Sequence, residues 1–304
     1  MITVFGSINV DLVFPVPILP RAGETVLGSD YRVALGGKGA NQAVAAARDG
    51  AKVRFYGRIG RDEFGRMARA GLVAAGVDVA GVAESVAPTG CAAICVDAAG
   101  RNQIAVAGGA NLELRAADVP DAALGPGTTL VLQMEAPADE VARLILRAHA
   151  RGVFVILNLA PARALGHDAL RGAGILVVNE SEAAALAHTQ QVTASEAAAI
   201  ARELAAVFGN TVVVTLGERG AVGASREKDW SVGALPVTAL DTTGAGDAFV
   251  GVLAAACDRG ETFATALHRA SIAGSLACLA PGAQPSLPTK AAIDARLGDL
   301  PSAI

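Results

Sequence analysis

The chain has 304 residues, of which 52% are hydrophobic and 18% charged, and its 29 acidic and 25 basic side chains give a net charge of −4. This composition excludes a disordered chain. The acidic balance and the 4% aromatic content also lack the basic surface and stacking platforms that nucleic-acid binding usually needs.

Short apolar runs of strand length alternate along the chain with Ala- and Leu-rich segments of helical spacing. Buried parallel strands and the helices that connect them have these patterns. The order therefore predicts an α/β fold with a doubly wound, mostly parallel sheet and helices on both faces. The expected strands are residues 2–5, 53–56, 130–132, 153–157, 175–178 and 212–216, and the expected helices are residues 40–48, 62–75, 138–150, 195–208, 248–258 and 263–279.

Two segments, residues 11–34 and 89–107, interrupt this alternation with Val-rich, strand-like stretches separated by turn residues. Each is about as long as one hairpin, which is too short for an independent domain. We expect a single α/β domain over residues 1–304, into which these two segments insert a small β-sheet lid.

The four cysteines, Cys91, Cys95, Cys257 and Cys278, have neither a disulfide framework nor a zinc-binding spacing, which predicts reduced, buried thiols. No apolar stretch approaches the ~20 residues of a membrane span, and the first residues lack the pattern of a signal peptide. We expect a cytoplasmic protein with no membrane partner.

Neither a complete P-loop nor a complete G-x-G-x-x-G motif is present, but two other glycine clusters each precede an Ala-rich helix. In the second cluster, Gly244, Ala245 and Gly246 come just before Asp247. The free N–H groups of a helix start form an anion hole for phosphate, and Asp247 is placed to accept a hydroxyl proton. On this cluster alone, a simple tight turn is an equally good interpretation.

The first cluster places Lys38 and Asn41 at another helix start, after Gly36 and Gly37. Close approach of the backbone and an amide side chain suit sugar hydroxyls or a phosphate. A glycine-closed turn between a strand and a helix explains the same residues about equally well.

Ten short motifs occur together in one order along nearly the whole chain. In this order they closely resemble the phosphofructokinase-B-type carbohydrate kinase family, and its ribokinase members above all. The motifs are residues 6–11 (GSINVD), 23–25 (GET), 36–41 (GGKGAN), 109–111 (GAN), 133–135 (QME), 158–163 (NLAPAR), 179–182 (NESE), 215–217 (TLG), 241–249 (DTTGAGDAF) and 282–286 (GAQPS).

The resemblance implies transfer of the γ-phosphoryl group of ATP to the 5-hydroxyl of D-ribose, which gives ribose 5-phosphate. Asp247 would be the catalytic base, and the amides of Gly244, Ala245 and Gly246 would form the anion hole. A helix N-terminus should lower the pKa of Asp247, but a weak base is adequate for a loose phosphoryl-transfer transition state. The implied sugar contacts are Asn9, Asp11, Gly37, Lys38, Asn41, Glu135 and Asp247.

The resemblance also implies where nucleotide and cations bind. Asn179 and Glu182 match an N-x-x-E motif, in which Glu182 would hold Mg²⁺ through water; on its own, Glu182 is more simply a solvated residue in the first turn of a helix. Thr215 and Gly217 would lie beside the nucleotide with Gly246. The implied site for a monovalent cation, K⁺ as activator, comprises Asp241, Thr243, Ala277, Ala280, Gly282 and Ser286.

The resemblance further implies a homodimer formed through the lid sheets. Two alternatives stay open from the sequence. One keeps the fold but changes the acceptor to a nucleoside, fructose or another pentose derivative. The other, more distant, is a sugar or nucleotide sensor without catalytic activity, although a sensor would have no use for the base Asp247.

Overall fold

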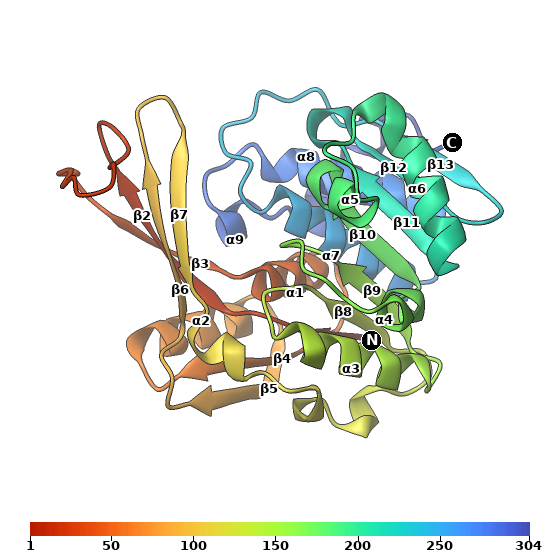
Figure 1. Ribbon diagram of the computed structural model, residues 1–304, viewed down its shortest axis with the longest axis horizontal. Helices are drawn as coiled ribbons and strands as arrows, with labels where there is room; N and C mark the ends of the chain where they lie inside the picture. Colours follow the sequence, from red (N-terminus) through yellow and green to blue (C-terminus); the bar gives the residue numbers. More distant parts are fainter.

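The computed structural model describes residues 1–304 and is built around a nine-stranded sheet in the order β13-β12-β11-β10-β9-β8-β1-β4-β5 (Figure 1). The strands from β11 to β5 in this order are parallel, and β12 and β13 are antiparallel at one edge. The strands are β1 (Ile2–Phe5), β4 (Val53–Gly60), β5 (Asp78–Ser85), β8 (Thr129–Leu132), β9 (Phe154–Asn158), β10 (Ile175–Asn179), β11 (Thr211–Thr215), β12 (Ala221–Ala224) and β13 (Asp229–Val232).

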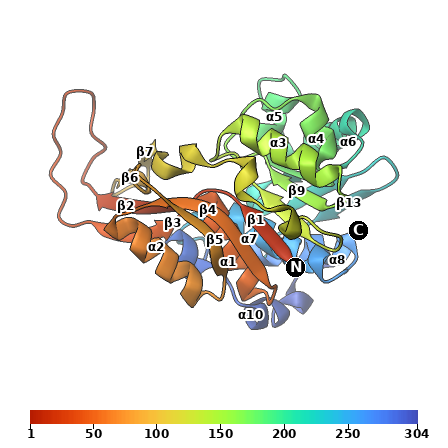
Figure 2. The ribbon, with the colours of Figure 1, turned by 90° about the horizontal axis from the view of Figure 1, so that it is seen from below.

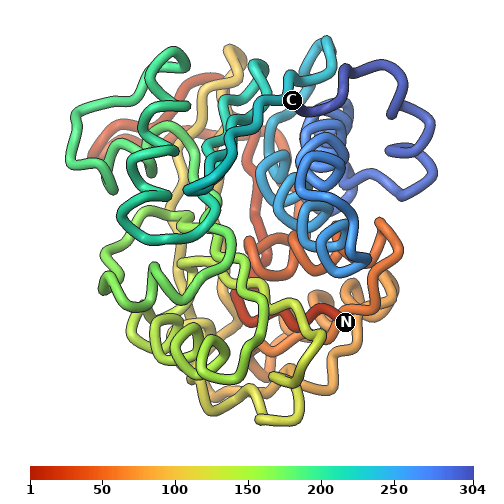
Figure 3. Tube along the Cα trace, turned by 90° about the vertical axis from the view of Figure 1, so that its right-hand side faces the viewer, coloured from red at the N-terminus to blue at the C-terminus, as the bar shows by residue number.

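Helices cover both faces of this sheet, so the predicted doubly wound α/β fold is confirmed. Figure 2 shows α3, α4, α5 and α6 on one face and α1, α2, α7 and α8 on the other. Figure 3 shows the same two layers end on, with the red first strand between them. The helices are α1 (Lys38–Arg48), α2 (Glu63–Ala74), α3 (Ala138–His149), α4 (His167–Gly172), α5 (Glu180–Leu186), α6 (Ala194–Phe208), α7 (Ala245–Asp258), α8 (Phe263–Ala277), α9 (Ala283–Ser286) and α10 (Lys290–Asp294).

The core has two halves because successive side chains of a strand point to opposite faces of the sheet. In β1, Ile2 and Val4 pack into the cluster that contains the buried residues of α1, α7 and α8. Phe5 packs into the other cluster, with α3 and α6. All three side chains are fully buried, which is why a parallel central strand has a continuous apolar sequence.

A separate four-stranded sheet, in the order β3-β2-β6-β7, projects from the α/β body at the left of Figure 1. Its central strands β2 and β6 are parallel, and both outer pairs are antiparallel. The small inserted sheet expected from the sequence is therefore present; the division of the chain into one domain stays a prediction. The strands are β2 (Asn9–Pro15), β3 (Arg32–Gly36), β6 (Gly90–Val96) and β7 (Asn102–Ala107).

The cysteine prediction was wrong in one respect. All four thiols are free, as expected, but each is only partly buried. Their host segments explain this: Cys91 and Cys95 lie on β6 of the small sheet, and Cys257 and Cys278 lie at the ends of α7 and α8. No helix is long and apolar enough to cross a bilayer.

Candidate active site

Asp247 lies in the first turn of α7, and two side chains of α1 hold its carboxylate. Asn41 Nδ2 donates to Asp247 Oδ2 at 2.9 Å, and Gln42 Nε2 donates to Asp247 Oδ1 at 2.9 Å. Asp247 is only 7% exposed. Both helices therefore begin at the same place, at the carboxyl ends of the parallel strands, where open α/β sheets bind ligands.

The pKa of Asp247 is raised, which corrects the expectation that the helix N-terminus lowers it. Burial of the carboxylate is the largest cause, and the nearby charge of Glu135 adds to it. Lys38 and the amides of Asn41 and Gln42 act in the opposite direction and do not outweigh burial. A raised pKa makes Asp247 a better proton acceptor than the sequence suggested.

The Glu135 carboxylate forms hydrogen bonds with residues after β1, at the start of β2 and at the start of α1. Its Oε2 accepts hydrogen bonds from Ser7 Oγ at 2.6 Å, from the Lys38 backbone N–H at 3.0 Å and from Asn9 Nδ2 at 3.5 Å. Ser7 Oγ in turn accepts from Gly39 N at 3.2 Å. Three of the predicted sugar-binding residues, Asn9, Lys38 and Glu135, are thus in direct contact.

Asp11 lies two residues after Asn9 in β2, so both side chains point to the same side of the small sheet. The pKa of Asp11 is raised to about 6, chiefly by burial and also by the neighbouring charges of Glu135 and Asp247. The Lys38 ammonium faces the same carboxylates. Its pKa is raised chiefly by Asp247 and also by Glu135 and Glu182.

Glycine is required at position 37, where the chain passes from β3 into α1. Gly37 has φ +89°, and a Cβ there would lie 2.7 Å from the backbone nitrogen of Asn9. At Gly36, where φ is not positive, a Cβ would lie 2.3 Å from Asp11 Oδ2, so the Asp11 side chain would have to move. The predicted contact residue Gly37 therefore lets β2 and α1 approach each other closely.

The glycine turn before α7 has the geometry of an anion hole at two of its three predicted residues. Gly244 is the N-cap with φ +81°, and the backbone N–H groups of Gly244 and Gly246 donate to no backbone acceptor. A Cβ on Gly246 would meet nothing within 4 Å, so open space adjoins it. The Ala245 N–H differs, because it donates to Thr242 O at 3.2 Å.

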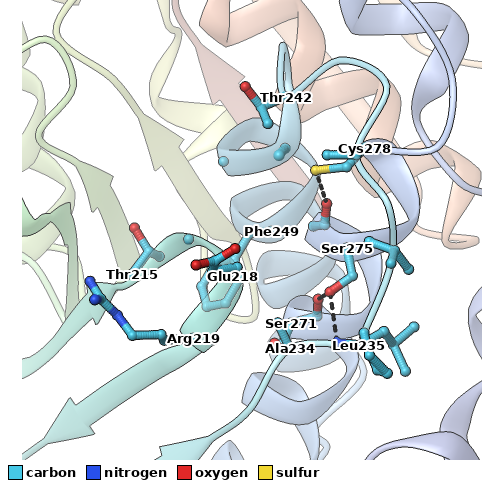
Figure 4. Close-up of a pocket in the computed structure, with 18 residues that line it drawn as sticks. Thr215, Glu218, Arg219, Ala234, Leu235, Thr242, Phe249, Ser271, Ser275 and Cys278 are labelled. Atoms are coloured by element: carbon cyan, nitrogen blue, oxygen red, sulfur yellow. Dashed lines mark hydrogen bonds between the residues drawn. The ribbon is translucent and has the colours of Figure 1, made fainter.

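A cavity of about 760 Å³ opens beside this turn (Figure 4). It includes three of the predicted nucleotide-binding residues, Thr215, Gly217 and Gly246. One wall comes from the carboxyl end of β11 and the 3₁₀ turn Gly217–Arg219, and another from α7 and α8. Its volume lies within the range of small-molecule and cofactor sites.

Asn179 and Glu182 form a capping box at the start of α5 and do not line this cavity. Asn179 Oδ1 accepts from Glu182 N, and Glu182 Oε2 accepts from Asn179 N, both at 2.8 Å. Glu182 is 6% exposed, which contradicts its simple interpretation as a solvated residue. Burial raises its pKa, although the Asn179 N–H and the charge of Lys38 oppose the shift.

Asp241 connects two loops by hydrogen bonds at the place where the monovalent cation site was expected. Its Oδ1 accepts from Thr243 N at 2.9 Å and Thr243 Oγ1 at 2.6 Å, and its Oδ2 accepts from Gly282 N at 2.8 Å. Burial alone would raise the pKa of Asp241, but these hydrogen bonds lower it overall. Three more residues were expected at this cation site. Ala277 is the last residue of α8, Ala280 lies in the loop after α8, and the buried Ser286 is the last residue of α9.

Comparison with known proteins matches residues 1–290 to the pfkB family of carbohydrate kinases. The chain belongs to this family. It is 37% identical to a ribokinase of Haemophilus influenzae over 95% of both chains, and 36% identical to a ribokinase of Bacillus subtilis over 95% of this chain and 96% of that one.

Solved structures of the same family have the same fold as this chain. A ribokinase from Thermotoga maritima is 30% identical and has a TM-score of 0.89, with 98% of this chain and 99% of that chain covered. An Arabidopsis thaliana ribokinase, solved as a complex with ribose and ATP, is 28% identical and has a TM-score of 0.88, covering 97% and 98%.

The sequence motifs of this pfkB kinase did not reveal the network behind Asp247. Gln42, which bonds Asp247 directly, is fully buried and also donates to Asn158 Oδ1 at 3.0 Å. Gln133 Nε2 donates to Gln42 Oε1 at 2.8 Å. The available signal was the polar pair Asn41–Gln42 within an otherwise Ala-rich helix.

Asn111 was also missed as a site residue, although its motif was noted. Its Nδ2 donates to Asn9 Oδ1 at 2.8 Å and to Ile8 O at 3.0 Å, and its Oδ1 accepts from Ile8 N at 2.9 Å. Asn111 thus fixes the orientation of the Asn9 amide, so that Asn9 Nδ2 points to Glu135.

Proposed function

We propose that this carbohydrate kinase transfers the γ-phosphoryl group of ATP to the 5-hydroxyl of D-ribose. The observation that carries the proposal is the convergence of a buried acid, an anion hole and a set of amides and carboxylates around one site. Asp247, Gly246 and Asn41 lie on two helix starts that meet there. The likeness to proteins named ribokinase over nearly the whole chain supports ribose as the acceptor.

Asn9, Asp11, Asn41 and Glu135 would bind the sugar hydroxyls. Carboxylate and amide groups suit this task because each can engage two neighbouring hydroxyls. Asn41 supplies a specific indication: its Nδ2 is bound to Asp247, but its buried Oδ1 has no hydrogen-bond donor. An unpaired buried acceptor is costly, and a sugar hydroxyl that donates to it would remove the cost.

In the proposed step, Asp247 accepts the proton of the 5-hydroxyl as the hydroxyl oxygen attacks the γ-phosphorus of ATP. The new O–P bond forms while the bond between the γ-phosphorus and the bridging oxygen breaks, and that electron pair leaves with ADP. The N–H groups of Gly244 and Gly246 stabilise the charge on the transferring group. Lys38, held protonated by three carboxylates, adds a positive charge on the sugar side.

Magnesium bound with ATP would neutralise phosphate charge during transfer. The chain gathers no group of three His, Cys, Asp or Glu side chains to hold a metal directly. Glu182 fits an indirect role, because its Oε2 caps Asn179 and its Oε1 accepts no protein hydrogen bond. We assign Glu182 to the waters of this ion and Asn179 to the adjacent nucleotide phosphates.

A monovalent cation would bind in the loops that Asp241 joins. The carbonyl oxygens of Thr243 and Ala280 accept no hydrogen bond from the backbone, so they are free to act as ligands. Oxygens of Ala277, Gly282 and Ser286 would complete the set. Since Thr243 directly precedes the anion hole, a bound K⁺ would strengthen the positive potential at Gly244 and Gly246.

The active unit would be a homodimer formed through the small sheet. The register places Val13, Ile94, Ile104 and Val106 on the same face as Asp11, and Ile104 and Val106 are 53% and 58% exposed. A second copy of this sheet would cover that apolar face. We place the enzyme in the cytoplasm, where ATP is available and the four unpaired thiols stay reduced.

The test is ATP consumption by the purified protein with D-ribose, 2-deoxy-D-ribose, D-fructose and adenosine, each with and without K⁺. We expect D-ribose to have the highest kcat/KM, with product identified as ribose 5-phosphate. A preference for adenosine or fructose would reject ribose as the acceptor. Ribose binding without any turnover would support the sensor instead.

A further inference from the structure

Gln42 lies in α1 beside Asp247 and is fully buried, so its amide depends on the protein for hydrogen bonds. Its Nε2 carries two hydrogens and has two acceptors, Asp247 Oδ1 at 2.9 Å and Asn158 Oδ1 at 3.0 Å. Its Oε1 accepts from Gln133 Nε2 at 2.8 Å. Both hydrogens of the amide are therefore used, and one of them points to the proposed base.

The backbone of β10 sets the orientation of the Gln42 amide. A carbonyl oxygen only accepts hydrogen bonds, so the Val177 carbonyl binds Asn158 Nδ2, at 3.2 Å. Asn158 Oδ1 then faces Gln42, and only the Nε2 side of Gln42 can bond to it. Gln133 cannot set the same orientation, since its own buried Oε1 has no partner to hold that amide in place.

Asp247 receives two N–H donors from consecutive residues of α1, one on each carboxylate oxygen. Asn41 Nδ2 bonds to Oδ2 and Gln42 Nε2 bonds to Oδ1, both at 2.9 Å. One such bond would leave the carboxylate free to rotate about its Cβ–Cγ bond, whereas two fix its plane. Both donors also favour the ionised form, because an N–H group cannot accept the hydrogen of a protonated carboxyl.

The surroundings of Asp247 otherwise oppose the ionised form that a base needs. Burial is the largest cause of its raised pKa, whereas the charge of Lys38 and the hydrogen bonds from Asn41 and Gln42 lower the pKa. Gln42 is thus one of the groups that offset burial of the carboxylate. The charged groups around it are Lys38 in α1, Asp11 in β2, Glu135 after β8 and, near Lys38, Glu182 in α5.

We propose that Gln42 is a positioning residue for phosphoryl transfer, which fixes the plane of the Asp247 carboxylate and keeps it ionised and ready to accept a proton. Its own orientation is set from β10 through Asn158. This inference rests on the proposed kinase function, in which Asp247 is the base. The role goes beyond packing, because an apolar side chain of the same size would fill the space without supplying the N–H group.

Gln42→Met tests the proposal, since methionine has nearly the shape of glutamine and no N–H donor. With saturating ATP and D-ribose, the single-turnover rate should fall about 10- to 100-fold at neutral pH. The acidic limb of its pH profile should move up by about one pH unit. The KM for ribose should change by less than about tenfold, because Asn41 is retained. An acidic limb at the same pH as in the parent protein would overturn the proposal.

Gln133→Met is the matched control. It removes a buried hydrogen bond from the same Gln42 amide, on the Oε1 side, and leaves the donor to Asp247 in place. We expect a lower Tm and an unshifted acidic limb. Equal shifts of the acidic limb in Gln133→Met and Gln42→Met would show that Gln42 acts only through packing.

Asn158→Leu tests the orientation of the Gln42 amide, and it carries the proposal if Gln42→Met does not fold. It removes the acceptor that holds Nε2, so the acidic limb should move in the same direction as in Gln42→Met. The double variant should show no shift beyond that of Gln42→Met, because Asn158 acts through Gln42. Additive shifts would contradict this route.

A titration without substrates separates this inference from the kinase proposal. Carbon-13 NMR of protein labelled at aspartate follows the Asp247 carboxyl, whose signal is identified by its loss in Asp247→Asn. Its pKa should be about one unit higher in Gln42→Met than in the parent protein. If the parent phosphorylated no sugar, the kinase proposal would fail, and this comparison would still decide what Gln42 does to the carboxylate. An unchanged pKa would overturn the inference.

Discussion

Asn41 Nδ2 donates a 2.9 Å hydrogen bond to Asp247 Oδ2, although the two residues are 206 positions apart. The contact joins the first turns of α1 and α7. One half of the Asn41 amide therefore orients the proposed base, and the Oδ1 half is free to bind the proposed sugar. Such an arrangement would couple acceptor binding to the geometry of proton transfer.

Replacing Asn41 tests the sugar side of this arrangement. Asn41→Ala is expected to raise the KM for D-ribose by about tenfold, because a hydrogen bond to a sugar hydroxyl is lost. Steady-state kinetics at saturating ATP measure the effect. Gln190→Ala, which removes an exposed amide between α5 and α6, serves as the control and should leave KM unchanged. An unaltered KM for Asn41→Ala would remove Asn41 from the sugar site.

The raised pKa of Asp11, about 6, predicts pH-dependent sugar binding. As the pH falls below about 6, Asp11 gains a proton and loses acceptor strength, so the KM for ribose should rise. Asp11→Asn should have a high KM that varies little over the same range. Kinetics between pH 5 and 8 provide the comparison, and an identical pH profile in the two proteins would contradict the assignment.

The same shift predicts a gain in stability when Asp11 is replaced. Asp11 holds its proton more tightly in the folded state than in the unfolded chain, where its pKa is near the ordinary value of 3.8. Ionised Asp11 therefore lowers stability as the pH rises from about 4 to about 6. Asp11→Asn should have a higher Tm than the parent protein at pH 7.5, with the difference shrinking toward pH 4. A lower Tm at pH 7.5 would argue against this explanation.

Gly244 is expected to matter for both stability and activity. Gly244→Ala forces a Cβ into left-handed backbone at φ +81° and to 3.1 Å from Ala283 Cα, at a cost of about 1–2 kcal/mol. Gly260→Ala is the matched control, because φ is +77° there and nothing lies within 4 Å. Thermal unfolding should show both variants destabilised, whereas only Gly244→Ala should lose ATP turnover. Equal activity of the two variants would contradict the anion hole.

Two substitutions in neighbouring residues of β7 test the proposed dimer. Ile104→Asp places a charge on the exposed apolar face of β7 and should shift the protein toward monomer in sedimentation experiments. Gln103→Asp places the same charge on the opposite face of β7 and should leave the dimer intact. If the parent protein is a monomer, or if both variants dimerise equally, the small sheet is not the interface.

Much of the fold could be predicted because central parallel strands, such as Ile2–Phe5, are apolar without interruption. The strands that were missed lack this feature. β5 at one edge is mostly unburied, and at the other edge β12 (AVGA) contains a glycine and β13 (DWSV) contains an aspartate and a serine. α7 begins three residues before its predicted start, since its first turn contains Gly246, a poor helix former.

The site was predicted as a set of motifs, but its connections were not. Gln42 contacts Asp247 and Asn158, and Gln133 contacts Gln42; only the folded chain brings these amides together. The direction of the Asp247 pKa shift also could not be predicted from the residues near it in the sequence. The helix N-terminus is visible in the sequence, whereas burial under α1 and the charge of Glu135 depend on tertiary structure.

The most direct test of the account is the single-turnover rate of Asp247→Asn beside its affinity for D-ribose. The substitution keeps the size of the side chain and removes the base. The account predicts that the rate of ribose 5-phosphate formation falls by about 10²–10⁴-fold, while the dissociation constant for ribose, measured by calorimetry, changes by less than about tenfold. A rate within a few-fold of the parent enzyme would contradict the role of Asp247 as the catalytic base.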